Sequence, residues 1–294
     1  MNHIIRLRDQ YRQNKATLLG SLADSGCSTR GVNAALRALS QLADDALRAL
    51  WQHAKFDSRF ALAAVGGYGR REQFPYSDVD VLVLLPDGQS PEQDAELKTR
   101  IESFIGSCWD MGLEIGSSVR SVSDCLKESA NDVTVQTALL EARLITGSRS
   151  LFDDFQQRYR AAMDPHAFFV AKTLEMQQRH NKFEDTPYSL EPNCKESPGG
   201  LRDLQIILWV AKASGFGNDW NALAKAGLTQ AGHVILFLTR DFQRQAPAAL
   251  LAAARAAGCM EITGCTAYGL MTDEGWLLDQ SGAAALVIEA PAGI

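Results

Sequence analysis

The segment AVGGYGRREQFPYSDVDVLVLL, residues 64–85, constrains the fold more than any other part of this sequence. It continues the apolar run FALA and ends in the apolar run VDVLVLL, and each run is typical of a buried β-strand. Asp78 and Asp80 stand two residues apart at the start of the second run, so both side chains project from the same face of that strand. The chain is therefore expected to bury this strand in a sheet and to leave two carboxylates together at one end.

Those two carboxylates predict a site for hard divalent cations such as Mg²⁺, which prefer oxygen ligands. Gly66 and Gly67 stand where the first strand ends, and without side chains their backbone N–H groups approach phosphate oxygens closely. Glu114 lies between apolar residues in a later strand candidate, LEIGSSV, where a role as a third metal-facing carboxylate would give it a partner. A single Asp-x-Asp step is usually a solvated turn, but the combination favours a catalytic metal site.

Transfer of a nucleoside monophosphate is the chemistry that suits this arrangement. The reaction requires in-line attack on the α-phosphorus while pyrophosphate leaves, and two metals ~4 Å apart stabilise both the entering and the departing oxygens. Such metals also assist a weak nucleophile such as a tyrosine hydroxyl, whose ordinary pKa is about 10. The remaining catalysis would come from positioning and electrostatic preorganisation.

The order of the elements predicts an α+β fold. A helix with apolar residues at three- and four-residue spacing is expected to follow Thr29, and another is expected from Leu97 to Cys108. The resulting strand–turn–strand–helix–strand order describes a small mixed sheet backed by helices. Residues 123–230 are predicted to be helical, apart from the loop DTPYSLEPNCKESPGG, whose Pro and Gly residues break helices.

The last part of the chain changes pattern again. HVILFLT is expected to form a strand, QAPAALLAAARAAG a helix, and EITGCTAYGL and WLLDQ two further strands. We therefore predict three domains: N-terminal helices with a catalytic sheet in residues 1–122, a helical domain in residues 123–230, and a βαββ unit in residues 231–294.

Composition argues against several classes of protein. The formal net charge is -6, whereas a protein that grips nucleic acid along its surface needs excess Lys and Arg. The six cysteines include no CxxC pair, which favours reduced thiols over a disulfide frame or a zinc site. The first residues lack the apolar run of a signal peptide, and no stretch approaches the ~20 apolar residues of a membrane helix. We expect a soluble, cytoplasmic protein without nucleic-acid or membrane partners. Four of its five tryptophans are expected in the core: Trp109, Trp209, Trp220 and Trp276.

At these motifs the sequence resembles the DNA-polymerase-β type of nucleotidyltransferase, whose hallmark is Gly-Gly or Gly-Ser followed by Asp-x-Asp and a third acid. Four segments, in order, are similar to the bifunctional uridylyltransferase/uridylyl-removing enzymes of nitrogen regulation, which modify the signalling protein PII. They are GGYGRREQFPYSDVD, WDMGLEIGSSVRSVSDC, TALLEARLITG and RHNKFEDTPYSLEPNCKESPGGLRDLQIILWVAK. The similarity extends from about residue 60 to residue 227. Its SPGGLRD loop is also similar to one in the glutamine synthetase adenylyltransferases.

The resemblance implies transfer of UMP from UTP to a tyrosine of PII, with Mg²⁺ or Mn²⁺. By motif, Asp78 and Asp80 would ligate metal, and Glu114 would complete the site and help deprotonate the acceptor hydroxyl. Gly66 and Gly67 would cradle phosphate.

Four further positions carry weaker implications. Ser77 would lie beside the phosphate cradle. Arg70, Lys195 and Arg202 would contact phosphate or base, because Arg and Lys suit triphosphate charge. The alternative for these three cations is that they are surface charges or partners of Glu72, Glu191 and Asp203. Gln73, Ser117 and Cys194 depart from the family pattern without removing a carboxylate.

A larger departure concerns the domains that follow in this family. The family carries a His-Asp phosphohydrolase domain and two ligand-sensing ACT domains, but none of the five histidines here is followed by Asp. The βαββ unit resembles one ACT domain, without an evident final helix and strand, and would bind an amino acid such as glutamine. We expect an abbreviated member, natural or engineered, without uridylyl-removing activity. The alternatives are a nucleotidyltransferase with another protein or a small molecule as acceptor, and a non-catalytic regulator that senses nucleotide or amino acid.

Overall fold

A computed structural model describes residues 2–24, 29–183, 193–219, 222–223, 231–239, 262–267, 269–272, 275–278 and 283–289. The chain divides into two compact units, Met1–Asp164 and Pro165–Ile294, and each unit is described by itself. The domain limits predicted at residues 122 and 230 stay predictions.

The first unit is built on a four-stranded mixed sheet with the order β3-β2-β1-β4. Its strands are β1 (Ala61–Ala64), β2 (Val79–Leu85), β3 (Ile115–Ser121) and β4 (Arg143–Gly147). β2 pairs with β3 in parallel, while β1 is antiparallel to both β2 and β4. The predicted α+β class with a small mixed sheet is confirmed. The prediction that residues 123–230 are helical apart from one loop is wrong at Arg143–Gly147, where β4 adds a fourth strand to the sheet.

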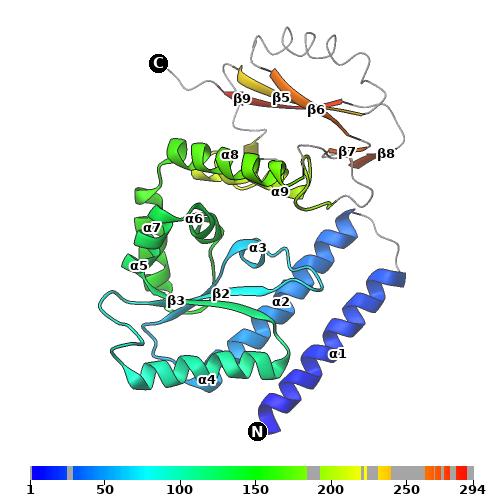
Figure 1. The fold of residues 1–294 in the computed structure, drawn as a ribbon. Helices are drawn as coiled ribbons and strands as arrows, with labels where there is room; N and C mark the ends of the chain where they lie inside the picture. The colour runs from blue at the N-terminus through cyan, green and yellow to red at the C-terminus, as the bar shows by residue number, and fades with distance from the viewer. Residues whose placement is uncertain are drawn as a thin grey trace. The chain divides into compact units, whose positions relative to one another are not determined.

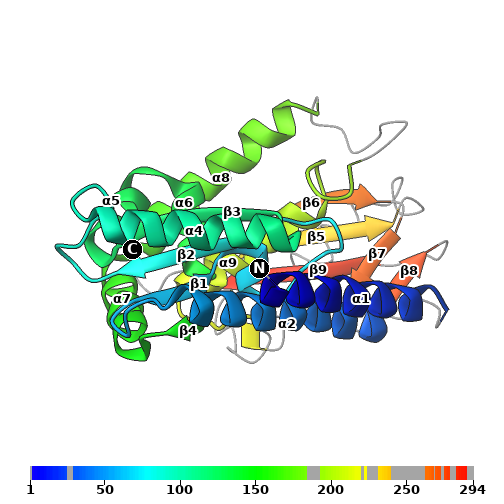
Figure 2. The same ribbon diagram turned by 90° about the horizontal axis from the view of Figure 1, so that it is seen from below.

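Helices cover both faces of this sheet (Figure 1). On one face lie α2 (Thr29–Ala54) and α4 (Ala95–Met111), with α1 (Asn2–Asp24) packed along α2 (Figure 2). The other face is covered by α5 (Val122–Asn131), α6 (Val133–Leu140) and α7 (Arg149–Ala162). The central strand β2 feeds both cores, because Val81 and Val83 pack with α2 and α4 whereas Leu82 and Leu84 pack with α5 and α7. A strand covered on both faces needs the nearly continuous apolar sequence that identified it.

The helix α4 carries the chain from the end of β2 back to the start of β3. Asp94 caps its first turn by accepting a hydrogen bond from the Leu97 backbone N–H at 3.0 Å, and Gly112 ends the helix with a left-handed φ of 84°. This crossover allows the parallel pairing of β2 with β3, which a tight turn does not permit. Because of this crossover, β3 begins at the same end of the sheet as β2.

The second unit begins with two helices, α8 (Pro165–Asn181) and α9 (Leu201–Ala213). Beyond them lies a three-stranded sheet with the order β6-β5-β9, in which β5 is parallel to β6 and antiparallel to β9. Its strands are β5 (Ala231–Thr239), β6 (Ile262–Ala267) and β9 (Ala283–Glu289). A separate hairpin joins β7 (Gly269–Thr272) to β8 (Gly275–Leu278).

The predicted C-terminal strands are confirmed in part. HVILFLT forms β5 and WLL belongs to β8, but EITGCTAYGL contributes to two strands, β6 and β7. The expectation that no final strand exists is wrong, because β9 closes the sheet beside β5. The helix expected over residues 245–258 lies outside the described residues.

Two further expectations concern apolar side chains. Trp209 lies in the core as predicted, but Trp109 is 55% exposed on the outer face of α4, so its core assignment is wrong. Trp220 and Trp276 lie outside the residues whose side chains are described. Within the described part of the chain, no helix combines the length and apolar character needed to cross a bilayer.

Candidate functional site

The parallel pairing of β2 with β3 brings the three predicted acidic residues, Asp78, Asp80 and Glu114, to the end of the first unit's sheet at which both strands begin. We call this end the acidic edge. Asp80 is opposite Gly116 in the register, and Val79 is opposite Ile115. The Val79 N–H donates to the Glu114 carbonyl at 2.8 Å, so Asp78 and Glu114 stand side by side just before these pairs. The chain positions of the three acidic residues therefore lie close together at the beginning of both strands: Asp80 lies within β2, whereas Asp78 and Glu114 stand immediately before β2 and β3.

The Asp80 carboxylate occupies a space between two glycines. A Cβ at Gly116 would lie 2.3 Å from Asp80 Oδ1, and a Cβ at Gly66 would lie 3.6 Å from Oδ2. Gly66 has a φ of 57°, a left-handed conformation that side chains rarely adopt. The Val65 N–H also donates to the Asp80 carbonyl at 3.0 Å. The Gly-Gly turn is therefore adjacent to the carboxylate that was predicted to share its site.

The glycine turn forms a short helical segment, α3 (Gly66–Gly69), which a buried ion pair holds in place. Tyr68 donates its hydroxyl to Asp44 at 2.6 Å, and Asp44 also accepts from both Nη atoms of Arg143, at 2.8 and 3.0 Å. Arg143 donates in addition to the Gly69 carbonyl at 3.3 Å. Asp44 is fully buried in α2 and Arg143 begins β4, so helix, strand and turn are joined at one point.

Electrostatics show that Tyr68 is a structural member of this group. Burial raises its pKa far above the ordinary value, and the neighbouring Asp44 carboxylate raises it further. A phenol with a raised pKa keeps its proton at neutral pH and acts as a hydrogen-bond donor. Sequence reasoning missed Asp44 and Arg143, because no local pattern connects positions that are 99 residues apart.

The loop between the turn and Asp78 is ordered by its own hydrogen bonds. The Gln73 side-chain amide donates to the Ser77 carbonyl at 2.7 Å, and the Ser77 N–H donates to the Phe74 carbonyl at 3.1 Å. Ser77 itself is exposed. Gln73, a departure from the family pattern, thus fixes the segment that leads directly into the acidic residues.

Arg70 lies over the glycine turn, and its guanidinium is already engaged. An Nη2 atom stands 3.7 Å from where a Cβ of Gly67 would be, close to the predicted phosphate cradle. The same guanidinium forms an ion pair with Glu72 at 2.7 Å and a longer one with Glu141 at 3.8 Å. The phosphate-binding role and the role of partner to Glu72 are therefore both compatible with its position.

The other two predicted cations belong to the second unit. Lys195 is exposed, and its backbone N–H donates to the Asn193 side chain at 3.0 Å. Arg202 pairs with Glu196 at 3.2 Å and donates to Gln205 at 3.1 Å. Asp203, suggested as an alternative partner of Arg202, is engaged elsewhere, and Glu191 lies outside the described residues.

The SPGGLRD loop is held to α8 by Asp203. This carboxylate pairs with Arg179 and with His180 Nε2, the latter at 2.9 Å, and accepts from the Gly199 N–H at 2.7 Å. The contact with Asp203 gives His180, near the end of α8, a structural partner. Beside this group the fully buried Lys172 lies 4.6 Å from the Trp209 ring, and burial lowers the pKa of its amine.

The donor set at the acidic edge fits a cation that arrives with its substrate. In the described part of the chain, no three His, Cys, Asp or Glu side chains are arranged around a single point where a metal would sit. Mg²⁺ rarely uses an all-protein cage: it is held by one or two carboxylates together with substrate phosphates and water. Two exposed aspartates of hard oxygen character, with Asp80 in a space kept open by glycines, meet that requirement.

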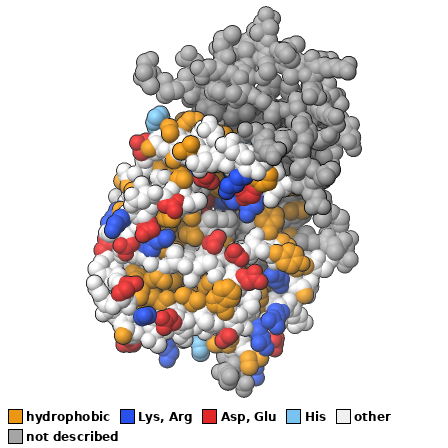
Figure 3. Space-filling view, in the orientation of Figure 1, with side chains coloured by type: hydrophobic (Ala, Val, Ile, Leu, Met, Phe, Trp, Pro, Cys, Tyr) orange, Lys and Arg blue, Asp and Glu red, His pale blue; other side chains and the backbone are white. Residues whose placement is uncertain are grey.

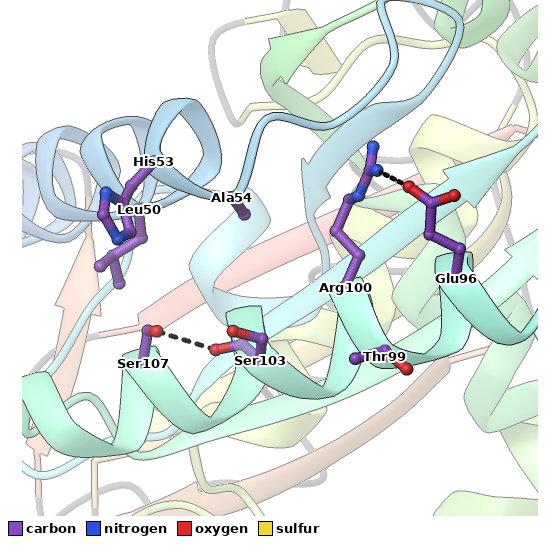
Figure 4. A pocket seen from close by; sticks show the side chains of 8 residues that line it. All are labelled: Leu50, His53, Ala54, Glu96, Thr99, Arg100, Ser103 and Ser107. Atoms are coloured by element: carbon purple, nitrogen blue, oxygen red, sulfur yellow. Dashed lines mark hydrogen bonds and ion pairs between the residues drawn. The ribbon is translucent and has the colours of Figure 1, made fainter.

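A separate hollow of about 340 Å³ lies between α2 and α4 (Figure 4). Side chains of His53, Arg100 and Ser107 line it, and Arg100 pairs with Glu96 at 2.6 Å. None of its lining residues is a predicted site residue. On the face drawn in Figure 3, acidic and basic side chains are interspersed, so no field of a single sign marks a polyanion surface there.

Two family models match this chain. Residues 15–116 match the family described as "Putative nucleotidyltransferase DUF294", and residues 167–241 match the family described as "GlnD PII-uridylyltransferase". Bifunctional uridylyltransferase/uridylyl-removing enzymes of Burkholderia mallei (strain SAVP1) and Burkholderia pseudomallei (strain K96243) are each 58% identical to it over 219 residues. The matched region covers 74% of this chain and 25% of each relative, so the chain spans about a quarter of the length of these relatives.

A solved structure titled "Crystal structure of the toxin-antitoxin with AMP-PNP" covers 48% of this chain and 95% of that one, with 13% identity and a TM-score of 0.26. Similarity at that level supports no conclusion. The sequence matches, in contrast, confirm the resemblance predicted from the motifs and support a nucleotidyltransferase.

Proposed function

We propose, on the premise that this chain is a relative of the bifunctional uridylyltransferase/uridylyl-removing enzymes, that it transfers UMP from UTP to a tyrosine hydroxyl of the signalling protein PII and releases pyrophosphate. One observation carries the proposal. The register of β2 and β3 brings the chain positions of Asp78, Asp80 and Glu114 together at the beginning of these strands, and the Gly66 turn lies against Asp80. Carboxylates beside a glycine turn suit a metal-bound triphosphate.

Each residue of this edge has a proposed task. Asp78 and Asp80 would hold Mg²⁺ or Mn²⁺ together with triphosphate oxygens, and Glu114 would complete the site and take up the phenolic proton. The metals, two in the proposed mechanism, would supply charge stabilisation at the entering and departing oxygens. The backbone N–H groups of Gly66 and Gly67 would receive phosphate oxygens, while Asp44 and Arg143 hold the turn in position.

Three cations are proposed as contacts for phosphate or base. Arg70 has the best geometric support because its guanidinium lies over Gly67. Lys195 is exposed, and Arg202 would have to exchange Glu196 for the nucleotide. Substitution of each by Ala should raise the KM for UTP with little change in kcat. Unchanged kinetics for a given variant would reject that residue's assignment.

The C-terminal sheet is proposed as an ACT-like unit that binds an amino acid such as glutamine. Its support is the sequence resemblance together with a small sheet in which β5 lies between β6 and β9. Calorimetric titration of the chain with glutamine, beside glutamate as control, tests it, and absence of heat for glutamine rejects it. We further propose no uridylyl-removing activity for this chain, which release of UMP from modified PII would contradict.

The central test is incubation of the purified chain with PII, Mg²⁺ and UTP labelled at the α-phosphate, with labelled ATP as a parallel donor. Label from UTP should appear on PII and should be lost with Asp78→Asn and with Asp80→Asn. Asp110→Asn, an exposed aspartate in the last turn of α4, is the matched control and should retain transfer. No label from either nucleotide, with the fold intact by circular dichroism, would favour another acceptor or a regulatory protein.

A further inference from the structure

The tyrosines of this chain differ sharply in their environment. Of the six, two lie outside the described residues. Tyr68 donates its hydroxyl to Asp44 at 2.6 Å, and Tyr159 donates to the Gln136 carbonyl at 2.5 Å. Tyr11 packs partly buried against the core, and burial raises its pKa. Three of the four described phenols are therefore withdrawn from reaction.

Tyr76 is the exception, with 94% of its surface exposed. Its ring rests on no other part of the described chain, and no hydrogen bond within the described residues engages its hydroxyl. A phenol exposed to this degree is accessible to a second protein molecule from solvent. The neighbouring Phe74 is also exposed, so the loop presents apolar surface to an approaching molecule.

The position of Tyr76 connects it with the acidic edge. It stands two residues before Asp78, a separation that spans at most ~7 Å even in an extended chain. The loop that carries it is held by the hydrogen bond from Gln73 to the Ser77 carbonyl. The exposed Tyr76 hydroxyl thus lies on a hydrogen-bonded loop next to Asp78. The acceptor proposed for this site is likewise a tyrosine hydroxyl.

We propose that the Tyr76 hydroxyl is itself an acceptor for a nucleoside monophosphate, delivered by the site of a second copy of this chain. This inference rests on the proposed function. In the step, the phenolic oxygen forms a bond to the α-phosphorus, the bond from that phosphorus to the bridging oxygen of the β-phosphate breaks, and pyrophosphate leaves with the electron pair. The phenolic proton passes to the Glu114 carboxylate of the enzyme copy and then to solvent. No oxidant or further reactant is needed.

Transfer between copies follows from the short tether between Tyr76 and its own site. In-line attack requires the phenolic oxygen opposite the departing pyrophosphate. Tyr76 is joined through a single residue to Asp78 of its own site, and this tether restricts where its hydroxyl can lie around that site. A second molecule meets no such restraint, because it can approach the loop from solvent.

The test separates enzyme from acceptor. An Asp80→Asn chain, inactive under the proposed function, serves as acceptor, and a Tyr76→Phe chain serves as enzyme, with a tag that distinguishes the two by mass. Both are incubated with Mg²⁺ and α-labelled UTP, with PII in a parallel tube. We expect the acceptor chain to gain the mass of one UMP, mapped to the peptide that contains Tyr76. The acceptor Asp80→Asn/Tyr76→Phe should lose the label, whereas Asp80→Asn/Tyr11→Phe should keep it.

The outcomes distinguish this proposal from the one on which it rests. PII labelled while the acceptor chain stays unlabelled overturns self-modification and leaves the PII reaction standing. Label on the acceptor chain that survives Tyr76→Phe overturns the assignment to Tyr76. Absence of label on both proteins, from chains that are folded by circular dichroism, overturns both proposals.

Discussion

At the scale of single residues, the acidic edge depends on the absence of side chains at two glycines as much as on the carboxylates. Asp80 projects into space that the absent side chains of Gly66 and Gly116 leave open. Asp44 and Arg143 hold the glycine turn beside Asp80 in place, and neither residue has a proposed part in the chemistry. Substitutions at the glycines therefore test the position of the carboxylates through the transfer rate. Substitutions at Asp44 test the stability of the turn through the free energy of unfolding.

Gly116→Ala should disable transfer without unfolding the chain. The new methyl group would lie 2.3 Å from Asp80 Oδ1, so the carboxylate must move. A displacement of about 1 Å at a reacting centre costs roughly 10²-fold in rate. We expect a loss of that order in kcat for transfer to PII, measured under saturating UTP.

Gly106→Ala is the matched control for this substitution. Gly106 lies within α4, and a methyl group there meets nothing within 4 Å. Transfer should be unchanged, and the free energy of unfolding should rise by roughly 0.5–1 kcal/mol because Ala is the better helix former. Equal activity in the two variants would show that the space around Asp80 is not critical.

Asp44→Ala should destabilise the first unit strongly. Removing a buried carboxylate leaves the Arg143 guanidinium without its partner, at a cost of about 3 kcal/mol, towards the lower end for buried pairs because Arg143 is partly exposed. The exposed neighbour Asp45, paired with Arg48 in the same helix, is the control, and Asp45→Ala should change stability by less than about 0.5 kcal/mol. Urea unfolding followed by circular dichroism measures both. Similar losses for the two variants would mean that the buried pair does not anchor the turn.

At the scale of secondary structure elements, the runs of apolar residues in the sequence predicted strands that are buried in the first unit's sheet. The run VDVLVLL became β2 with the same limits, because a strand covered on both faces must be apolar along its whole length. LEIGSSV overlaps β3, which begins at Ile115, so Glu114 stands one residue before the strand on which it was expected. The Val79 N–H donates to the Glu114 carbonyl, and two short segments thus predicted that the backbone positions of Asp78 and Glu114 lie close together.

Features that depend on tertiary context were not readable in this way. The segment RLITG is short, and only its pairing with β1 makes it the strand β4. AAALVIE resembles a helical segment in composition, but it pairs along β5 as β9. Trp109 lies among apolar residues in sequence, yet it belongs to the face of α4 that turns away from the core.

The ends of α4 provide a prediction at this scale. Asp94 caps the N-terminus through the Leu97 N–H, whereas Asp110 lies near the C-terminus, where its charge opposes the helix dipole. Asp94→Ala should lower the free energy of unfolding by about 1 kcal/mol. Asp110→Ala should leave it unchanged or raise it slightly. Thermal unfolding of both variants decides, and a larger loss from Asp110→Ala would contradict the capping argument.

At the scale of the whole molecule, acid stability draws on an ion pair that joins distant segments. Asp87, after β2, accepts from Arg158 of α7 at 2.7 Å and from the Ser123 N–H of α5 at 2.8 Å. Arg158, foremost, lowers the Asp87 pKa below its usual range. A carboxylate whose folded pKa is depressed stabilises the fold above its unfolded pKa of about 3.9, and this contribution is lost as the pH falls through the folded pKa.

Arg158→Ala should therefore destabilise the protein at pH 7, and the deficit should disappear in acid. Because both partners are well exposed, we expect a deficit of only ~0.2–1 kcal/mol at neutral pH. Urea unfolding at pH 7 and near pH 3 measures the difference. Arg149→Ala, whose pair with Asp153 is 3.9 Å long and exposed, is the control and should show no such trend. A deficit that persists undiminished at the lower pH would point to packing instead of charge.

The ion pair between Asp44 and Arg143 also determines when, during synthesis of the chain, the glycine turn can be anchored. The two residues are 99 positions apart, and ribosomes extend chains at about 5–20 residues per second. Roughly 5–20 s must therefore pass after Asp44 is made before the glycine turn can acquire its anchor. For the later part of that interval the nascent chain contains Asp78 and Asp80 but lacks the strand that secures the turn beside them. A ribosome-bound intermediate of this protein is thus expected to emerge without a competent site, however complete its acidic motif.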